Sequence, residues 1–85
     1  MRIDKFLKVS RLIKRREIAK ELCDDQDVFL NDKPAKPSAE VEAGDLIRLH
    51  LGRHRLTVKV LSILPFASKA SAGTMYEVID DKIVE

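Results

Sequence analysis

The segment Arg2-Ile-Asp-Lys-Phe-Leu-Lys-Val-Ser-Arg-Leu-Ile-Lys-Arg-Arg16 combines a helical period with a high density of positive charge. Apolar or small side chains recur at the i, i+3, i+4, i+7 spacing that lines one face of a helix: Ile3, Phe6, Leu7 and Ser10. Cations fall on the opposite side of the same helical wheel: Arg2, Lys5 and Lys8. The pattern predicts an amphipathic helix over residues 2–9, apolar inward and basic outward.

Positive charge is concentrated at the start of the chain. The first twenty residues hold eight Lys or Arg side chains and two acids, which gives a local net charge of +6. The other sixty-five residues carry a net charge of −4, so the whole-chain value of +2 hides a polarised molecule. A basic patch attracts a polyanion through its field and through release of counterions, with no chemical step required.

A second helix is predicted over residues 15–24. Its apolar stripe consists of four side chains: Ile18, Ala19, Leu22 and Cys23. Arg16 and Lys20 lie four residues apart on one flank, and the acids of this helix lie on the other: Glu17, Glu21 and Asp24. The basic flank therefore stays free for a ligand, and the short link at 11–14 predicts a helix-turn-helix-like pair.

After residue 24 the pattern changes from helical to extended. Four β runs are predicted: Val28–Leu30, Ile47–Leu51, Leu56–Val60 and Met75–Ile79. Turn signals stand at Asn31-Asp32 and at Gly52-Arg53, the second of which suits a tight hairpin. We expect residues 65–73 to form an exposed loop and residues 80–85 to form a frayed acidic tail. The predicted fold class is α+β, with two N-terminal helices followed by a small, mainly antiparallel sheet.

Several function classes lack support in the sequence. The single cysteine, Cys23, allows no disulfide framework, and no signal-peptide h-region or membrane-length apolar run is visible. We therefore expect a cytoplasmic protein that binds no membrane. There is no phosphate-binding loop, dinucleotide loop or nucleophile motif, so we expect no enzymatic activity, no catalytic residue and no cofactor. His50 and His54 lack a third ligand, which argues against a metal site.

The opening segment resembles the S-four RNA-binding domain, a family named for a protein of the small ribosomal subunit. Later pieces agree with the family pattern: Ala19–Leu22, Val28–Asn31, Ala35–Ser38 and Gly44–Ile47. The likeness covers residues 1–62 as an S-four-like RNA-binding domain. Residues 63–85 are expected to add a loop, a last strand and an acidic tail to this single domain. In the family, two helices and a following β-turn form the RNA-binding surface.

The resemblance also implies which residues contact RNA. Those that fall on the family's basic motif are Arg2, Lys5, Lys8, Arg11, Arg15 and Arg16, and those on the β-turn side are Lys36 and Ser38. The charge pattern adds Lys14, in the link, and Lys20, on the basic flank of the second helix. Arginine suits such contacts because its planar fork binds phosphate bidentately. Asp4 and Glu17 could orient Arg or Lys side chains toward RNA, but surface ion pairs of little energetic weight are the favoured expectation.

The chain departs from the family pattern at two places. Family members often have Gln-Gly-Arg before the first strand, where this chain has Asp25-Gln26-Asp27, and their Asn-Gly turn is Asn31-Asp32 here. A left-handed residue is usual at such a helix exit, so replacement of glycine by Gln26 is expected to alter that exit. The acid at position 27 removes a cationic contact. We therefore expect the RNA-binding surface to be weighted toward the first helix.

Within the family, the opening run is most similar to small stand-alone bacterial members that act in ribosome-associated quality control, and to their heat-shock relative. The likeness implies a non-catalytic monomer that binds ribosomal RNA and peptidyl-tRNA on stalled large subunits. It also implies support for tailing of the nascent chain by a quality-control tailing factor. Two alternatives remain open: rescue of free large subunits, as for the heat-shock relative, and helix-turn-helix DNA binding. The acidic flank of the second helix disfavours a major-groove recognition role.

Overall fold

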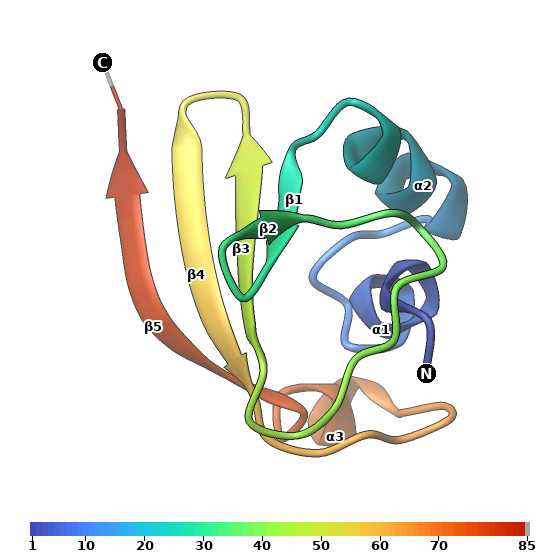
Figure 1. Cartoon of the computed structure of the whole chain (residues 1–85). Helices are drawn as coiled ribbons and strands as arrows, with labels where there is room; N and C mark the ends of the chain where they lie inside the picture. The colour runs from blue at the N-terminus through green and yellow to red at the C-terminus, as the bar shows by residue number, and fades with distance from the viewer. Residues whose placement is uncertain (85) are drawn as a thin grey trace.

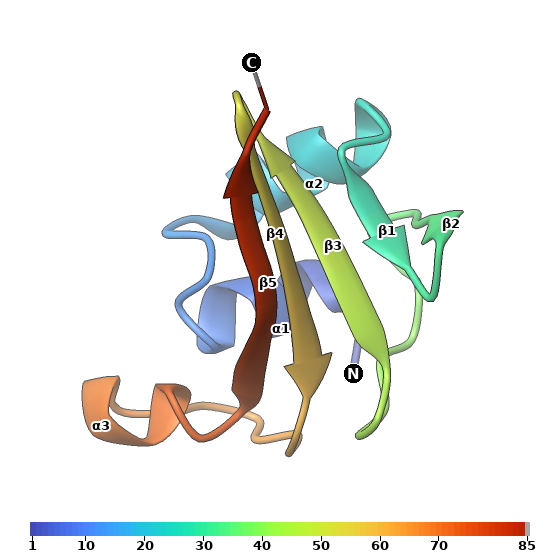
Figure 2. The same ribbon diagram turned by 90° about the vertical axis from the view of Figure 1, so that its left-hand side faces the viewer.

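The computed structural model describes residues 1–84. The elements in chain order are α1 (Ile3–Val9), α2 (Arg16–Asp24), β1 (Val28–Leu30), β2 (Lys33–Pro34), β3 (Leu46–Leu51), β4 (His54–Val60), α3 (Lys69–Ala72) and β5 (Tyr76–Ile83). The strands form an antiparallel sheet in the order β2-β1-β3-β4-β5. Figures 1 and 2 show α1 and α2 on one face of this sheet, with α3 at one end. The predicted α+β class is confirmed.

The helical periodicity of the opening segment is confirmed by burial. Ile3, Phe6 and Leu7 are fully buried, and Ser10 lies against them. In α2 the buried face centres on Ala19 and Cys23, whereas Ile18 is 41% exposed. The predicted four-residue stripe was therefore too wide. Ala19 and Cys23 are buried, Leu22 packs partly buried against the core, and only Ile18 is left at the exposed edge of the stripe.

The core lies between this helix pair and the inner face of the sheet. In β3, Ile47 and Leu49 are fully buried, while the alternate residues Arg48 and His50 face outward. Val58 of β4 pairs with Ile47 and is also fully buried. Complete burial of such an aliphatic side chain contributes about 1.5–3 kcal/mol, so this layer holds the helix pair in a fixed position.

The expected loop at 65–73 is interrupted by the short helix α3. Ser68 caps this helix, because its Oγ accepts from the N–H of Ser71 at 3.2 Å. The backbone N–H of Ser68 in turn donates to the Ser71 Oγ at 2.9 Å. This reciprocal pair is a capping box with serine in place of the usual acid, which is why a search for Glu or Gln misses it.

The expected frayed tail was also wrong for the described residues. Asp80 to Ile83 continue β5 and pair with Thr57 to His54 of β4. The pairing exists because β4 begins at His54, two residues earlier than predicted, and because a register shift at Thr57/Val58 accommodates the longer partner. The N–H of Val84 donates to the Arg53 carbonyl at 2.8 Å. Glu85, the last residue of the expected tail, lies outside the described residues.

Candidate nucleic-acid interface

A buried carboxylate stands at the centre of the basic segment. Asp4, in the first turn of α1, is fully buried. Arg2 donates to it from Nε and Nη2, at 3.2 and 3.1 Å, in a two-point contact. Arg16, the first residue of α2, donates from Nη2 at 3.3 Å. The expectation of a surface ion pair at Asp4 was wrong, because one carboxylate joins cations from two elements.

The environment of Asp4 keeps it ionised. Burial alone raises the pKa of its carboxyl, but the hydrogen bond from Arg16, the backbone N–H of Lys5 and the charges of Arg16 and Arg2 together outweigh burial. The net result is a pKa below the ordinary aspartate value. The three charged groups therefore retain one net positive charge. The Arg2 and Arg16 side chains are 45% and 40% exposed, so both can be reached by a ligand from solvent.

The link between the helices has one buried apolar residue, Ile13, and exposed cations on either side of it. Ile13 is buried, and its N–H donates to the Leu7 carbonyl at 3.0 Å. Arg11 follows the end of α1 with φ +64°, and this left-handed turn directs the chain back toward the sheet. Arg15 precedes α2 in an extended conformation. Arg11 and Arg15 are both exposed on either side of the buried Ile13.

The remaining cations of the two-helix unit are open to solvent. Within residues 1–84 no ion pair involves Lys5, Lys8, Arg11, Lys14, Arg15 or Lys20. Lys5 is half-buried and the other five are exposed. Glu17 and Glu21 leave Lys20 unpaired, although both lie on the same helix. The structure thus brings Arg2 and Arg16 into one cluster and leaves the other six predicted cations unneutralised on the same helix pair.

The predicted β-turn residues lie beside the start of α1. The N–H groups of Ile3 and Asp4 donate to the carbonyls of Ala39 and Pro37, at 2.7 and 3.3 Å. These bonds hold the 36–41 segment against the helix, and so place Lys36 and Ser38 at the same end of the molecule as Arg2. Both are exposed, and the Ser38 hydroxyl makes no hydrogen bond in the described part of the chain. It does not bond its own backbone, as turn serines often do.

The family departure at position 26 leaves the helix exit intact. Gln26 has φ +60°, the left-handed conformation that glycine usually supplies. Its N–H donates to the Cys23 carbonyl at 3.0 Å, and the Asp27 N–H donates to the Leu22 carbonyl at 2.8 Å. This is the hydrogen-bond pattern of a Schellman motif. The expectation of an altered exit was therefore wrong, since Gln26 takes the strained conformation.

Two further side chains of the described residues, Cys23 and His50, have shifted pKa values. Burial, and then the charges of Asp4 and Asp24, raise the pKa of the Cys23 thiol to about 11, so it stays protonated. Burial and the neighbouring Arg55 and Arg48 lower the pKa of His50. In residues 1–84, no three His, Cys, Asp or Glu side chains gather as metal ligands. The same residues contain no helix with the length and hydropathy needed to span a bilayer.

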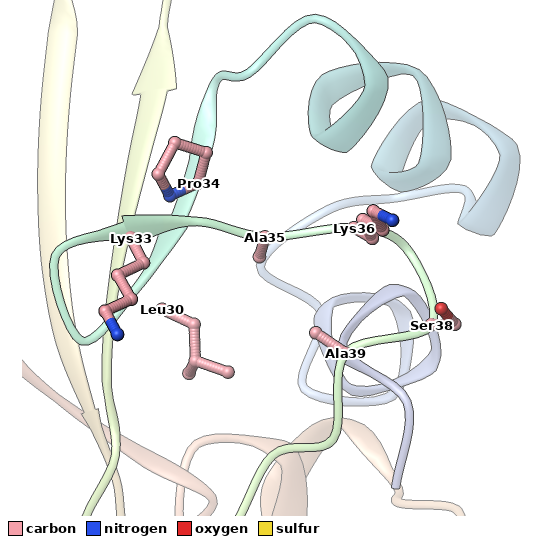
Figure 3. A pocket seen from close by; sticks show the side chains of 7 residues that line it. All are labelled: Leu30, Lys33, Pro34, Ala35, Lys36, Ser38 and Ala39. Atoms are coloured by element: carbon pink, nitrogen blue, oxygen red, sulfur yellow. The ribbon is translucent and has the colours of Figure 1, made fainter.

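Sequence reasoning missed two features of this surface. One is the burial of Asp4. Its position in the sequence could have indicated this, because Asp4 lies on the same helical face as the buried residues Ile3 and Leu7. The other is Lys33, which lines a groove of about 400 Å³ together with Lys36 and Ser38. Figure 3 shows this groove between the β1–β2 hairpin and the following loop. Its signal was the repeat Lys33-Pro-Ala-Lys36, which places two lysines in one short extended segment.

Comparisons with known proteins agree with this geometry. A family model described as the S4 domain matches residues 1–47. The RQC P-site tRNA stabilizing factor of Bacillus subtilis (strain 168) is 42% identical over 82 residues, which cover 96% of this chain and 95% of that protein.

Two solved structures share the fold. One, described as a trimeric structure of Vibrio cholerae Heat Shock Protein 15, has a TM-score of 0.86 at 30% identity and covers 92% of this chain and 80% of that one. The solution structure of the hypothetical protein HP1423 has a TM-score of 0.82 at 36% identity, over 96% and 100% of the two chains. The two-helix basic unit, the matching family model and the full-length relative lead to one conclusion: the chain belongs to the S4 domain family.

Proposed function

We propose that this protein is a non-catalytic RNA-binding factor of the large ribosomal subunit. In this proposal it binds ribosomal RNA and the peptidyl-tRNA of a stalled subunit, and so supports ribosome-associated quality control. The observation that carries the proposal is the pair Arg2 and Arg16, fixed by the buried Asp4 within a surface of unpaired cations. The name of the relative that is 42% identical, a P-site tRNA stabilizing factor, supports the choice of tRNA.

The proposed mechanism is preferential binding of one RNA arrangement. Arg2 and Arg16 come from different elements but share one anchor, so they present their forks at a fixed separation. Two phosphates at a matching separation gain charge-assisted hydrogen bonds without first ordering long side chains. Folded RNA is read mainly through shape and backbone, which suits a rigid basic face. A factor that binds one tRNA–rRNA arrangement more tightly stabilises it by that difference in affinity, with no reaction step.

The proposal includes the cell compartment and the partners. It takes the protein to be a cytoplasmic monomer that shares the stalled subunit with a tailing factor, whose extension of the nascent chain it supports. A second candidate is rescue of free large subunits. The observation that favours it is the close structural match to Heat Shock Protein 15. DNA recognition is disfavoured because α2 exposes Glu17, Glu21 and Asp24, which would face backbone phosphates in a major groove.

Co-sedimentation with purified ribosomal particles tests these candidates. Wild-type protein should pellet with large subunits that carry peptidyl-tRNA, more than with free large subunits or duplex DNA. Arg16→Ala should weaken this binding about tenfold or more, since a charge-assisted hydrogen bond contributes about 1.5–3 kcal/mol. Arg53→Ala, an exposed arginine in the β3–β4 turn, is the matched control and should change binding less than twofold. Equal effects of the two substitutions would reject a specific face.

The protein's preference among free large subunits, tRNA-carrying large subunits and duplex DNA separates the candidate functions. Equal binding to free and tRNA-carrying large subunits would favour the rescue role, and preference for duplex DNA would reject the ribosomal proposal. Circular dichroism of each variant checks that the helix pair is intact. Addition of a tailing factor to the tRNA-carrying subunits then tests whether nascent-chain extension depends on this protein.

A further inference from the structure

The groove beside the arginine pair has an apolar floor and a positively charged rim. Leu30, Pro34, Ala35 and Ala39 supply most of its lining, and the polar residues are Lys33, Lys36 and Ser38. In Figure 3, Leu30 and Ala39 reach into the same space from the hairpin and from the loop. Its volume of about 400 Å³ falls within the range of about 300–1,000 Å³ typical of small-ligand sites.

The rim has cations and a donor but no acid. Within residues 1–84, Lys33 and Lys36 are exposed and take part in no ion pair. Of the acids nearby in sequence, Asp32 pairs with Arg48 at 3.3 Å and Glu40 pairs with the N-terminal ammonium at 2.7 Å. Asp24 lies on the far side of Lys36, where it lines a separate pocket, and does not line the groove. The groove is therefore complementary to a ligand with an apolar or flat body and an attached anion.

The groove is also continuous with the proposed RNA-binding surface. Ala39, which lines the groove, and Pro37, in the same loop, accept hydrogen bonds from the N–H groups of Ile3 and Asp4, which directly follow Arg2. A polyanion held by Arg2 and Arg16 therefore passes close to the groove. This continuity favours a nucleotide of the bound RNA over an acidic peptide as the occupant, since one strand would satisfy both surfaces.

We propose that the groove receives a single unstacked nucleotide of the bound RNA. The base lies against Leu30, Ala35 and Ala39, and its phosphate is held by Lys36, with Lys33 and Ser38 as further donors. Bases in a duplex are stacked and cannot enter, whereas a bulged nucleotide or a loop nucleotide can. This proposal rests on the proposed function and adds to it the recognised RNA feature, an extruded nucleotide next to a helical segment.

Two RNA hairpins of identical stem, both closed by the same tightly structured tetraloop that leaves no unstacked nucleotide free and one of them with a single bulged nucleotide, test the proposal. Wild-type protein should bind the bulged hairpin at least fivefold more tightly, measured by fluorescence anisotropy. Ala39→Leu adds bulk to the groove without removing a charge and should abolish this preference. Ala43→Leu, the same change at an exposed alanine outside the groove, should retain it. Lys36→Ala should weaken binding of the bulged hairpin more than binding of the perfect one.

The outcomes separate this proposal from the one on which it rests. Equal affinity of the wild type for both hairpins, with both still weakened by Arg16→Ala, would overturn the groove site and leave the RNA-binding face standing. Loss of Arg16 dependence for both hairpins would instead overturn the proposed function. A methyl NMR spectrum gives a second readout, in which the Leu30, Ala35 and Ala39 signals should shift with the bulged hairpin only. Shifts of the same signals by an acidic peptide, and not by RNA, would reject a nucleotide occupant.

Discussion

At the scale of single residues, Asp4 is the most consequential side chain of the basic segment. It removes one unit of positive charge from a surface that binds a polyanion, which by itself weakens binding. Against that cost it joins Arg2, which precedes α1, and Arg16, which begins α2, at one buried point. The two guanidinium groups are therefore already ordered before RNA binds, so less side-chain entropy is lost on binding. These two effects have opposite signs, and a substitution at Asp4 tells them apart.

We predict that Asp4→Asn weakens RNA binding although it raises the net charge by one. Without the shared carboxylate the two forks move independently, and we expect an affinity loss of about fivefold or more, as two side chains regain about 0.5–1.5 kcal/mol each of ordering cost. Glu17→Gln adds the same charge at an exposed acid of α2 and should leave affinity equal or slightly higher. Titration of a ribosomal RNA fragment by anisotropy measures both. Tighter binding by Asp4→Asn would show that net charge dominates.

The lowered pKa of Asp4 predicts how stability responds to acid. Because the folded-state pKa lies below the unfolded one, the ionised carboxylate contributes stability that is complete above the unfolded value of about 3.9. This contribution is lost as the pH falls through the folded-state pKa. The difference in melting temperature between wild type and Asp4→Asn should therefore be large at pH 7 and shrink below pH 4. A difference that stays constant from pH 7 to pH 2.5 would contradict this linkage.

At the scale of elements, a residue just after α2 has a strained backbone conformation that glycine at this position would relieve. Gln26 takes a left-handed conformation, yet all the hydrogen bonds of the motif are made. The residue is exposed and forms no other hydrogen bond within the described residues. The strained conformation of Gln26 therefore lowers stability, and no side-chain hydrogen bond of Gln26 in the described part of the chain compensates for it.

We predict that Gln26→Gly stabilises the protein by about 0.5–1 kcal/mol. Glycine avoids the penalty of about 1–2 kcal/mol for a left-handed side-chain residue, and part of that gain is offset by its greater freedom in the unfolded chain. Urea unfolding followed by circular dichroism measures the change. Gln26→Ala is the matched control: it keeps the Cβ and the strain, so it should not stabilise. RNA affinity should stay within twofold in both variants.

The elements differ in how far sequence alone could determine them. Those with a strong local period were predicted to within about two residues, because burial of Ile3, Phe6 and Leu7, or of Ile47 and Leu49, follows directly from spacing. The second half of β5 was missed because Asp80 to Lys82 read as a polar tail, and only their pairing with β4 makes them a strand. The groove was missed for a similar reason, since its floor combines a strand residue with a loop that α1 holds in place.

At the scale of the whole molecule, charge differs between the two-helix segment and the last strand. The helix pair carries the unpaired cations on one side of the core, and the last strand, β5, carries Glu77, Asp80 and Asp81 at the far edge of the sheet (Figure 1). Asp80 and Asp81 already pair with Lys82 and His54. The unpaired cations of the helix pair therefore attract a polyanion to that side of the molecule before contact.

This arrangement predicts a steep and localised salt dependence. If the helix face contacts about four to six phosphates, affinity for ribosomal RNA should fall by about two to three powers of ten between 50 and 200 mM salt, because each contact releases counterions. Arg16→Ala should reduce the magnitude of the slope of log affinity against log salt by about one contact. Lys82→Ala removes the same positive charge on β5 and should leave the slope unchanged. If both substitutions shifted the slope equally, RNA would be responding to total charge, and the fixed arginine pair would have no part in orienting the protein. A slope that changes only with the helix-face substitution locates the phosphate contacts on α1 and α2.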